Sequence, residues 1–207
     1  PAGGASLTAA LAAGAPVTLP TLDSFVDGAA VARIGVRPFD ILRQVPPQHV
    51  LRIPENRLCI TIQEILNTEG IVLEPAGALS IDALRDLGPE IEGRRIVCVA
   101  TGGNFDFERL PDVKERAMRF AGLKKYYVLR MPQRPGALRD FLDILGPDDD
   151  IARFEYLKKS ARNFGSVLIG IESREPQAFA QLETRMAELG MAARDLTGDP
   201  LLSELVI

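Results

Sequence analysis

The part of the chain after Gly122 carries the pattern that most restricts its fold. Segments with strand periodicity and segments with helix periodicity follow one another there in the order β-α-β-β-α-β. The expected strands are 126–131, 151–157, 166–171 and 192–196, and the two expected helices begin behind Pro135 and Pro176. This order is typical of the split-βαβ, or ferredoxin-like, fold. We therefore expect residues 122–207 to form one domain of this kind.

One expected strand of this domain has an aromatic face. Phe154 and Tyr156 alternate with Arg153 and Glu155, so the two aromatic side chains share one face of the strand. A face of this kind most often packs against a helix inside a core. We therefore expect Phe154 and Tyr156 to be core residues.

Residues 1–121 combine helix and strand signals in a different order. Residues 95–101 form a β-branched run before Gly102-Gly103, which predicts a buried strand feeding a glycine turn. A second, shorter strand is predicted near residues 49–53. The expected helices are 5–13, 55–70, 75–87 and 107–120. Helix, strand, glycine turn and helix in succession predict an α/β layer, so the whole chain is expected to be α/β with two domains, 1–121 and 122–207.

Composition excludes several classes of protein. The net charge is −4 at pH 7, which provides no electrostatic footprint for nucleic acid. No apolar run approaches the roughly 18 residues that would span a membrane. The two cysteines, Cys59 and Cys98, form no C-x-x-C pattern, so we expect two buried thiols, no disulfide framework and no metal site. The single histidine, His49, has no partner pattern and is not assigned to catalysis.

Two motifs in the first part are candidates for contact with a ligand. The run Thr101-Gly-Gly-Asn104 places a hydroxyl and two glycines at the end of the predicted strand, where backbone can approach a ligand closely. The run Glu74-Pro-Ala-Gly-Ala78 places a carboxylate before a helix. Each motif taken alone also fits a purely structural interpretation, a tight turn in the first case and a helix cap in the second.

Together with the segment from Phe25 to Gly35, these motifs resemble, in order and spacing, the later part of the catalytic domain of the threonine dehydratase family. The members of that family are fold-type-II pyridoxal-phosphate enzymes. The segment after residue 121, notably Pro132-Gln-Arg-Pro-Gly-Ala-Leu138 and Phe154-Glu-Tyr156, resembles the single ACT-like regulatory domain of the short biosynthetic form. The resemblance implies a partial fold-type-II domain followed by an ACT-like domain.

The resemblance also implies roles. Thr101 would hydrogen-bond the pyridine nitrogen of pyridoxal 5'-phosphate, with Gly102 beside it, and Gly28 and Glu74 would lie near the ring. The family converts L-threonine to 2-oxobutanoate and ammonia, the first step towards isoleucine, and its implied location is cytoplasmic. Isoleucine and valine would be the allosteric ligands, and a homo-oligomer is implied.

The sequence also departs from the family pattern. No lysine stands in the Ser-x-Lys-x-Arg-Gly context that binds the cofactor covalently, and the tetraglycine phosphate loop is absent from this sequence. Without that lysine and that loop the chain lacks both the covalent link and the backbone cradle for the phosphate. We therefore expect the C-terminal part of the enzyme, with no catalytic residue in this chain and no activity alone, unless another chain supplies the missing N-terminal half.

The candidate regulatory site is the turn between the first strand and first helix of the second domain. Its residues are Arg134, Pro135, Gly136, Ala137 and Leu138. N–H groups at a helix start favour a carboxylate, Gly136 allows close approach, and Leu138 offers an apolar wall for an aliphatic side chain. Structurally, Pro135-Gly136 is also a well-formed helix start.

Two hypotheses follow from the sequence. The chain is the regulatory end of a threonine dehydratase, or it is a free-standing amino-acid-binding module that acts through a partner protein.

Overall fold

The computed structural model describes residues 1–157 and 164–199 and divides the chain into two compact units, Pro1–Ala117 and Met118–Ile207. The α/β fold class is confirmed, with every strand of the described residues in the second unit. The domain boundary expected after residue 121 stays a prediction. No helix in the described part of the chain is long and apolar enough to cross a membrane.

The first unit is built from helices joined by loops, and it forms no strand anywhere in residues 1–117. Its elements are α1 (Ser6–Ala13), α2 (Val36–Leu42), η1 (Pro47–His49), α3 (Glu55–Glu69), α4 (Pro75–Asp82), η2 (Ala83–Asp86), η3 (Gly88–Ile91) and η4 (Phe107–Arg109). Helix α5 (Leu110–Phe120) follows and runs past the end of the unit. The expected helices therefore form, although α4 stops at Asp82 and continues only as a 3₁₀ turn.

Helix α3 shows why the spacing of apolar residues predicts a helix here. Leu58 and Ile62 are buried on one face and Ile65 packs beside them, as the spacing i, i+4, i+7 predicts. The helix ends where Gly70 takes a left-handed conformation, with φ +66°. This face joins Phe25, Val26, Leu73, Ala78, Phe105 and Val113 in the core of the unit.

The two strands expected in the first unit do not form. Residues 94–106 and 50–54 have no regular secondary structure. Segment 94–106 lies along α4, where the Ser80 hydroxyl donates to the carbonyl oxygen of Val99 at 2.8 Å. Val97 and Val99 are 89% and 68% exposed, so this β-branched run has no sheet to join within the unit. A strand needs a ladder partner, and the sequence pattern cannot supply one.

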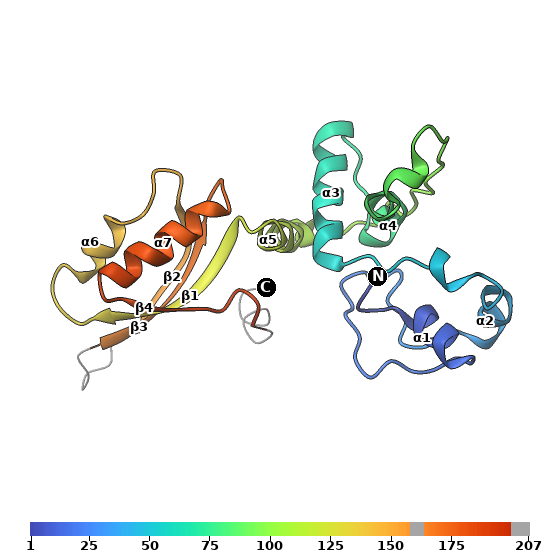
Figure 1. The fold of residues 1–207 in the computed structure, drawn as a ribbon, viewed down its shortest axis with the longest axis horizontal. Helices are drawn as coiled ribbons and strands as arrows, with labels where there is room; N and C mark the ends of the chain where they lie inside the picture. Colours follow the sequence, from blue (N-terminus) through green and yellow to red (C-terminus); the bar gives the residue numbers. More distant parts are fainter. Residues whose placement is uncertain (158–163, 200–207) are drawn as a thin grey trace. The chain divides into compact units, whose positions relative to one another are not determined.

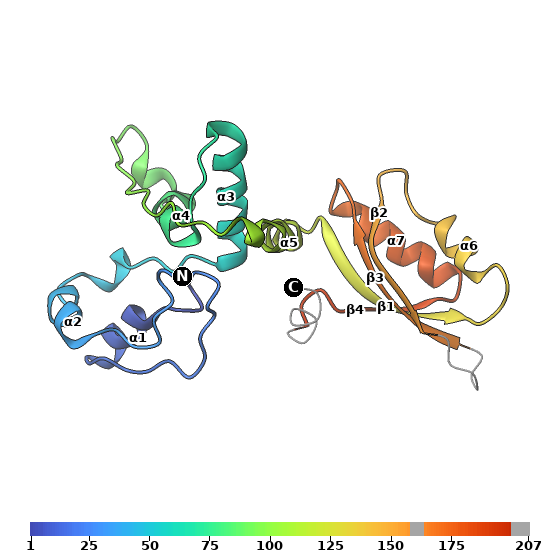
Figure 2. The same ribbon diagram turned by 180° about the vertical axis from the view of Figure 1, so that it is seen from behind.

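The second unit has the expected β-α-β-β-α-β order. Its elements are β1 (Lys124–Pro132), α6 (Ala137–Leu142), β2 (Asp150–Leu157), β3 (Phe164–Glu172), α7 (Gln177–Glu188) and β4 (Ala192–Asp195). The strands form one antiparallel sheet in the order β2-β3-β1-β4, which is ferredoxin-like topology. Helices α6 and α7 cover one face of this sheet, in front of the strands in Figure 1 and behind them in Figure 2.

The register of the sheet places alternate apolar residues under the helices. Tyr127 of β1 pairs with Ile169 of β3 and with Asp195 of β4. Leu129, Val167, Ile169 and Ile171 are fully buried against Phe141 of α6 and Phe179 and Leu182 of α7. Strands β2 and β4 are the two edges of the sheet, and the two pockets described below lie beside these edges.

Candidate cofactor and effector sites

The sequence motifs of the first unit meet in space. The backbone N–H of Glu74 donates to the carbonyl oxygen of Gly102 at 3.2 Å, which ties the start of α4 to segment 94–106. Gly102 has a φ of +82°, and a Cβ atom at this position would overlap the Glu74 side chain. Only glycine satisfies both the left-handed conformation and the close approach.

Gly77 and Gly28 complete this arrangement, which we call the glycine cradle (Gly28, Glu74, Gly77, Thr101 and Gly102). A Cβ on Gly77 would overlap the carbonyl oxygen of Thr101, so α4 packs directly on the backbone there. A Cβ on Gly28 would lie 3.1 Å from Ala76 Cβ and 3.5 Å from Glu74 Oε1. The structure thus brings together the four residues expected at the cofactor. Gly77 was overlooked as a site residue, although it stands inside the Glu74–Ala78 motif.

The loop that carries Gly28 is held by two arginines. The guanidinium carbons of Arg109 and Arg116 lie 5.0 Å and 4.3 Å from the centroid of the buried Phe25 ring. Arg109 Nη2 also donates to the carbonyl oxygen of Phe25 at 2.6 Å. Cation–π contacts at a desolvated ring are worth about 2 kcal/mol, so these side chains fix the loop against α5.

The regulatory turn lines a cavity of about 630 Å³, which we call the effector pocket. It is enclosed by the end of β1, the following turn, α6 and β2. Its residues are Met131, Pro132, Arg134, Pro135, Gly136, Ala137, Leu138, Arg139, Leu142, Phe154 and Tyr156. All five residues expected at the regulatory site therefore line this pocket.

The expectation that Phe154 and Tyr156 are core residues is wrong. They are 37% and 41% exposed, because α6 ends at Leu142 and leaves the β2 edge of the sheet uncovered. The Tyr156 ring lies over Gly165, where a Cβ would stand 2.6 Å from Tyr156 Cε2. The missing side chain of Gly165 thus lets this ring lie against β3 as a wall of the effector pocket.

The two arginines of the effector pocket differ in their partners. Arg134 forms an ion pair with Asp140 and also donates to the carbonyl oxygen of Pro135. The Arg139 side chain forms no hydrogen bond or ion pair with any residue that the structure describes. Arg139 is therefore the arginine of this pocket whose side chain has no partner among the described residues. It follows the predicted motif by one residue, and no sequence signal separated it from other surface arginines.

Gly136 adopts a left-handed backbone conformation that the sequence analysis did not predict. Its φ is +86°, and a Cβ there would meet only Arg134 Nη1, at 3.8 Å. A bulky residue at 136 would strain the backbone whether or not a ligand approaches. A substitution at Gly136 is therefore a poor probe of binding, and Arg139 and the 42%-exposed Leu138 are better ones.

Comparison with known proteins follows the same division of the chain. Residues 1–102 match the family described as pyridoxal-phosphate dependent enzyme, and residues 115–206 match the C-terminal regulatory domain of threonine dehydratase. The whole chain is 42% identical to the L-threonine dehydratase biosynthetic IlvA of Halalkalibacterium halodurans, over 50% of that protein. The chain belongs to the threonine dehydratase family. It is also 42% identical to the protein of the same name from Staphylococcus saprophyticus, over 49% of that protein.

The chain thus spans about half the length of these threonine dehydratases. Among solved structures, the processed form of threonine deaminase isoform 2 from Solanum lycopersicum is 30% identical to the chain. The two structures superpose with a TM-score of 0.49, covering 56% of this chain and 34% of the other.

The glycine cradle is closely packed around Glu74. The Glu74 side chain occupies the space that a Cβ of Gly102 would need, and its Oε1 lies 3.5 Å from the position of a Cβ on Gly28. Glu74 and Thr101 give the cradle a carboxylate and a hydroxyl, two groups that can hydrogen-bond a polar ring. Across the residues that the structure describes, no group of three or more His, Cys, Asp or Glu side chains could hold a metal ion.

Cys59 and Cys98 are free thiols in different environments. Cys59 is fully buried, as expected, and burial raises the pKa of its thiol to about 12. Cys98 is half-buried, so the expectation of two buried thiols is only partly met. A thiol with so high a pKa is not a nucleophile at neutral pH.

Proposed function

We propose that this chain is the C-terminal part of a biosynthetic threonine dehydratase, whose second unit senses isoleucine. The complete enzyme converts L-threonine to 2-oxobutanoate and ammonia. The observation that carries the sensor role is the effector pocket, which combines a free cation with an apolar wall. The similarity of the whole chain to biosynthetic threonine dehydratases favours this function over that of a free-standing module.

The effector pocket suits a branched aliphatic amino acid. Arg139 would hold the carboxylate, because a guanidinium offers paired N–H donors to the two carboxylate oxygens. Leu138, Leu142 and Phe154 would contact the aliphatic side chain. Isoleucine presents one more methylene to this wall than valine does, which is worth about 0.8 kcal/mol, so isoleucine should bind more tightly.

The glycine cradle would hold one side of the pyridoxal-phosphate ring. Bound there, the cofactor supplies an electron sink for bonds at the α-carbon of the amino acid. The Thr101 hydroxyl would hydrogen-bond the pyridine nitrogen, and Gly28, Gly102 and Glu74 would lie beside the ring. A neutral hydroxyl partner leaves that nitrogen unprotonated, which suits elimination of the threonine hydroxyl better than transamination.

Calorimetric titration of isoleucine and valine into the chain tests the sensor role. We expect wild type to bind both amino acids, and Arg139→Gln and Leu138→Asp each to weaken binding at least tenfold. Arg194→Gln is the matched control, because Arg194 is an exposed arginine outside the pocket and its side chain has no ion pair or hydrogen bond among the described residues.

Circular dichroism should show native folding of each variant. Wild type that binds neither amino acid at millimolar concentration would reject the sensor role for this chain. Folded Arg139→Gln and Leu138→Asp proteins with wild-type affinity would reject the effector pocket as the site.

A further inference from the structure

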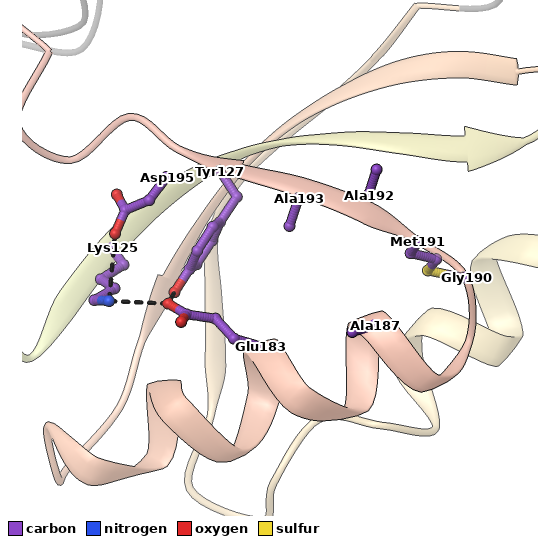
Figure 3. A pocket seen from close by; sticks show the side chains of 9 residues that line it. All are labelled: Lys125, Tyr127, Glu183, Ala187, Gly190, Met191, Ala192, Ala193 and Asp195. Atoms are coloured by element: carbon purple, nitrogen blue, oxygen red, sulfur yellow. Dashed lines mark hydrogen bonds and ion pairs between the residues drawn. The ribbon is translucent and has the colours of Figure 1, made fainter.

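A second cavity lies at the other edge of the sheet, between α7 and the edge strand β4. Its volume is about 550 Å³, and we call it the α7–β4 pocket. Figure 3 shows the residues that line it: Lys125, Tyr127, Glu183, Ala187, Gly190, Met191, Ala192, Ala193 and Asp195. No residue of this pocket belongs to the effector pocket or to the glycine cradle.

The α7–β4 pocket has one polar end and one apolar end. Lys125, Glu183, Asp195 and the Tyr127 hydroxyl gather at the polar end in Figure 3. Ala187 of α7 and Ala193 of β4 face the middle, and Met191 closes the other end. The hollow exists because small side chains occupy positions on both α7 and β4. Its apolar length suits a short aliphatic chain.

The hydrogen bonds at the polar end leave one acceptor open. Glu183 Oε1 accepts from Lys125 Nζ at 2.9 Å and from the Tyr127 hydroxyl at 2.8 Å. Glu183 Oε2 accepts nothing from the residues that the structure describes. A ligand that donates hydrogen bonds can therefore reach Oε2 without breaking the existing contacts.

The charges of this end favour a cation. Lys125 is the one positive side chain that lines the pocket within the described residues. Its Nζ forms ion pairs with Glu183 Oε1 at 2.9 Å and with Asp195 Oδ2 at 3.3 Å. Its ammonium group also lies over the rings of Tyr127 and Phe179. Because the lining has two carboxylates and one ammonium group, it carries one excess negative charge.

These ion pairs persist at neutral pH. Burial lowers the pKa of Lys125, but its hydrogen bonds with Glu183 and Asp195 outweigh burial and raise it overall. Burial raises the pKa of Asp195, whereas its hydrogen bonds with Thr197 and Lys125 lower it overall. Lys125 is thus charged and paired with both carboxylates, and a ligand carboxylate would meet two carboxylates and a single ammonium group that they already share.

We propose that the α7–β4 pocket binds a short primary aliphatic amine as its ammonium ion. The ammonium group donates to Glu183 Oε2, and the alkyl chain lies between Ala187 and Ala193. The effector pocket has the opposite preference, because Arg139 there awaits an anion. The two pockets therefore discriminate by charge, and the α7–β4 pocket does not depend on the sensor role proposed above.

The test is titration of n-butylamine into the ¹⁵N-labelled chain, followed by amide chemical shifts. Phosphate buffer at constant ionic strength avoids buffers that are themselves primary amines. We expect saturable shifts at Ala187, Ala193 and Tyr127 with a millimolar dissociation constant. n-Butyrate should cause none of these shifts, and isoleucine should shift the effector pocket but not Ala187 or Ala193.

Two variants separate the polar and apolar ends. Glu183→Gln keeps an amide oxygen for Tyr127 and Lys125 but removes the charge, and it should weaken n-butylamine binding at least tenfold. Ala187→Leu fills the apolar end and should abolish binding. Ala180→Leu is the matched control, because Ala180 is exposed on the same helix and lies outside the pocket; it should bind as wild type does.

Three results would overturn the proposal. The first is the absence of saturable shifts with n-butylamine at concentrations well above millimolar. The second is equal binding of n-butyrate or isoleucine in this pocket, which would show that the charge of the lining does not select the ligand. The third is wild-type affinity in either Ala187→Leu or Glu183→Gln with a native amide spectrum.

Discussion

Arg57 bridges two carboxylates in different environments, and this allows burial to be weighed against the number of contacts. Arg57 Nη1 and Nη2 donate to both oxygens of Asp86, at 2.6 Å and 2.7 Å, whereas Arg57 Nε donates to Asp82 at 2.8 Å. Asp82 also accepts from the Thr61 hydroxyl at 2.6 Å. The Asp82 side chain is fully buried, and the Asp86 side chain is 30% exposed.

Arg57 donates two hydrogen bonds to Asp86 and one to Asp82, although its Nη2 also lies 2.7 Å from Asp82 Oδ2. Counting the hydrogen bonds donated by Arg57 predicts that Asp86 matters more, and burial predicts the reverse. Removal of one partner from a buried ion pair costs about 3–5 kcal/mol, because the other charge is left desolvated. An exposed pair is worth about 0–1 kcal/mol, because water and salt screen it. Arg57 keeps Asp86 when Asp82 is changed, so we expect Asp82→Asn to cost about 3 kcal/mol and Asp86→Asn less than about 1 kcal/mol.

Cys59 provides the assay. The chain has two cysteines, both in the first unit, and a Cys98→Ser background leaves Cys59 as the single thiol. Cys59 is fully buried and packs in the same core as α3 and α4. A thiol reagent can therefore modify it only after the unit opens, and the labelling rate reports the free energy of that opening when reclosing is fast.

The expected rates differ clearly. A loss of about 3 kcal/mol corresponds to labelling roughly a hundredfold faster, and 1 kcal/mol to about fivefold. Asp82→Asn should therefore accelerate labelling far more than Asp86→Asn does. If Asp86→Asn accelerates labelling as much as Asp82→Asn, the number of hydrogen bonds donated by Arg57 outweighs burial and the reasoning is refuted.

Three further predictions follow from the two units. The chain alone should show no threonine deaminase activity and no covalent pyridoxal phosphate, since no lysine stands in the cofactor motif; a borohydride-fixed cofactor adduct on a lysine of this chain would contradict this. A protein comprising residues 1–121 should self-associate, because Val97, Val99 and Phe107 expose apolar surface; a cooperative, monomeric species in analytical ultracentrifugation would disprove it. Burial and the hydrogen bond to Glu183 raise the pKa of Tyr127, so the contribution of its protonated hydroxyl to stability is complete below pH 10 and decreases as pH rises further. The midpoint temperature of thermal unfolding should therefore decrease more steeply from pH 8 to 11 in wild type than in Tyr127→Phe.

Local sequence patterns were sufficient to predict the fold of the second unit, because its strands pair with one another inside that unit. The β-α-β-β-α-β order could be predicted because β1 and β3 have alternating burial and every strand finds its ladder partner inside the same 90 residues. The short strand β4 is exposed along its whole length and forms by pairing with β1. Helix α3 was readable because one face is apolar and Gly70 ends it. The same reading failed for residues 95–101, because a β-branched run becomes a strand only when another strand lies beside it, and within the first unit none does.

The candidate sites divide in the same way. The sequence alone predicted the motifs around Glu74 and Thr101 and the turn that begins at Arg134. Each of them has its glycine, proline and polar residues within a few consecutive positions.

Tertiary structure alone decided what surrounds these motifs. It placed Phe154 and Tyr156 in a pocket wall, because α6 is too short to cover the edge strand β2. It also assembled the polar end of the α7–β4 pocket from Lys125, Glu183 and Asp195, which lie on three different elements. No local pattern encodes that assembly, because the packing of α7 against the sheet and the pairing of β1 with β4 bring those charges together.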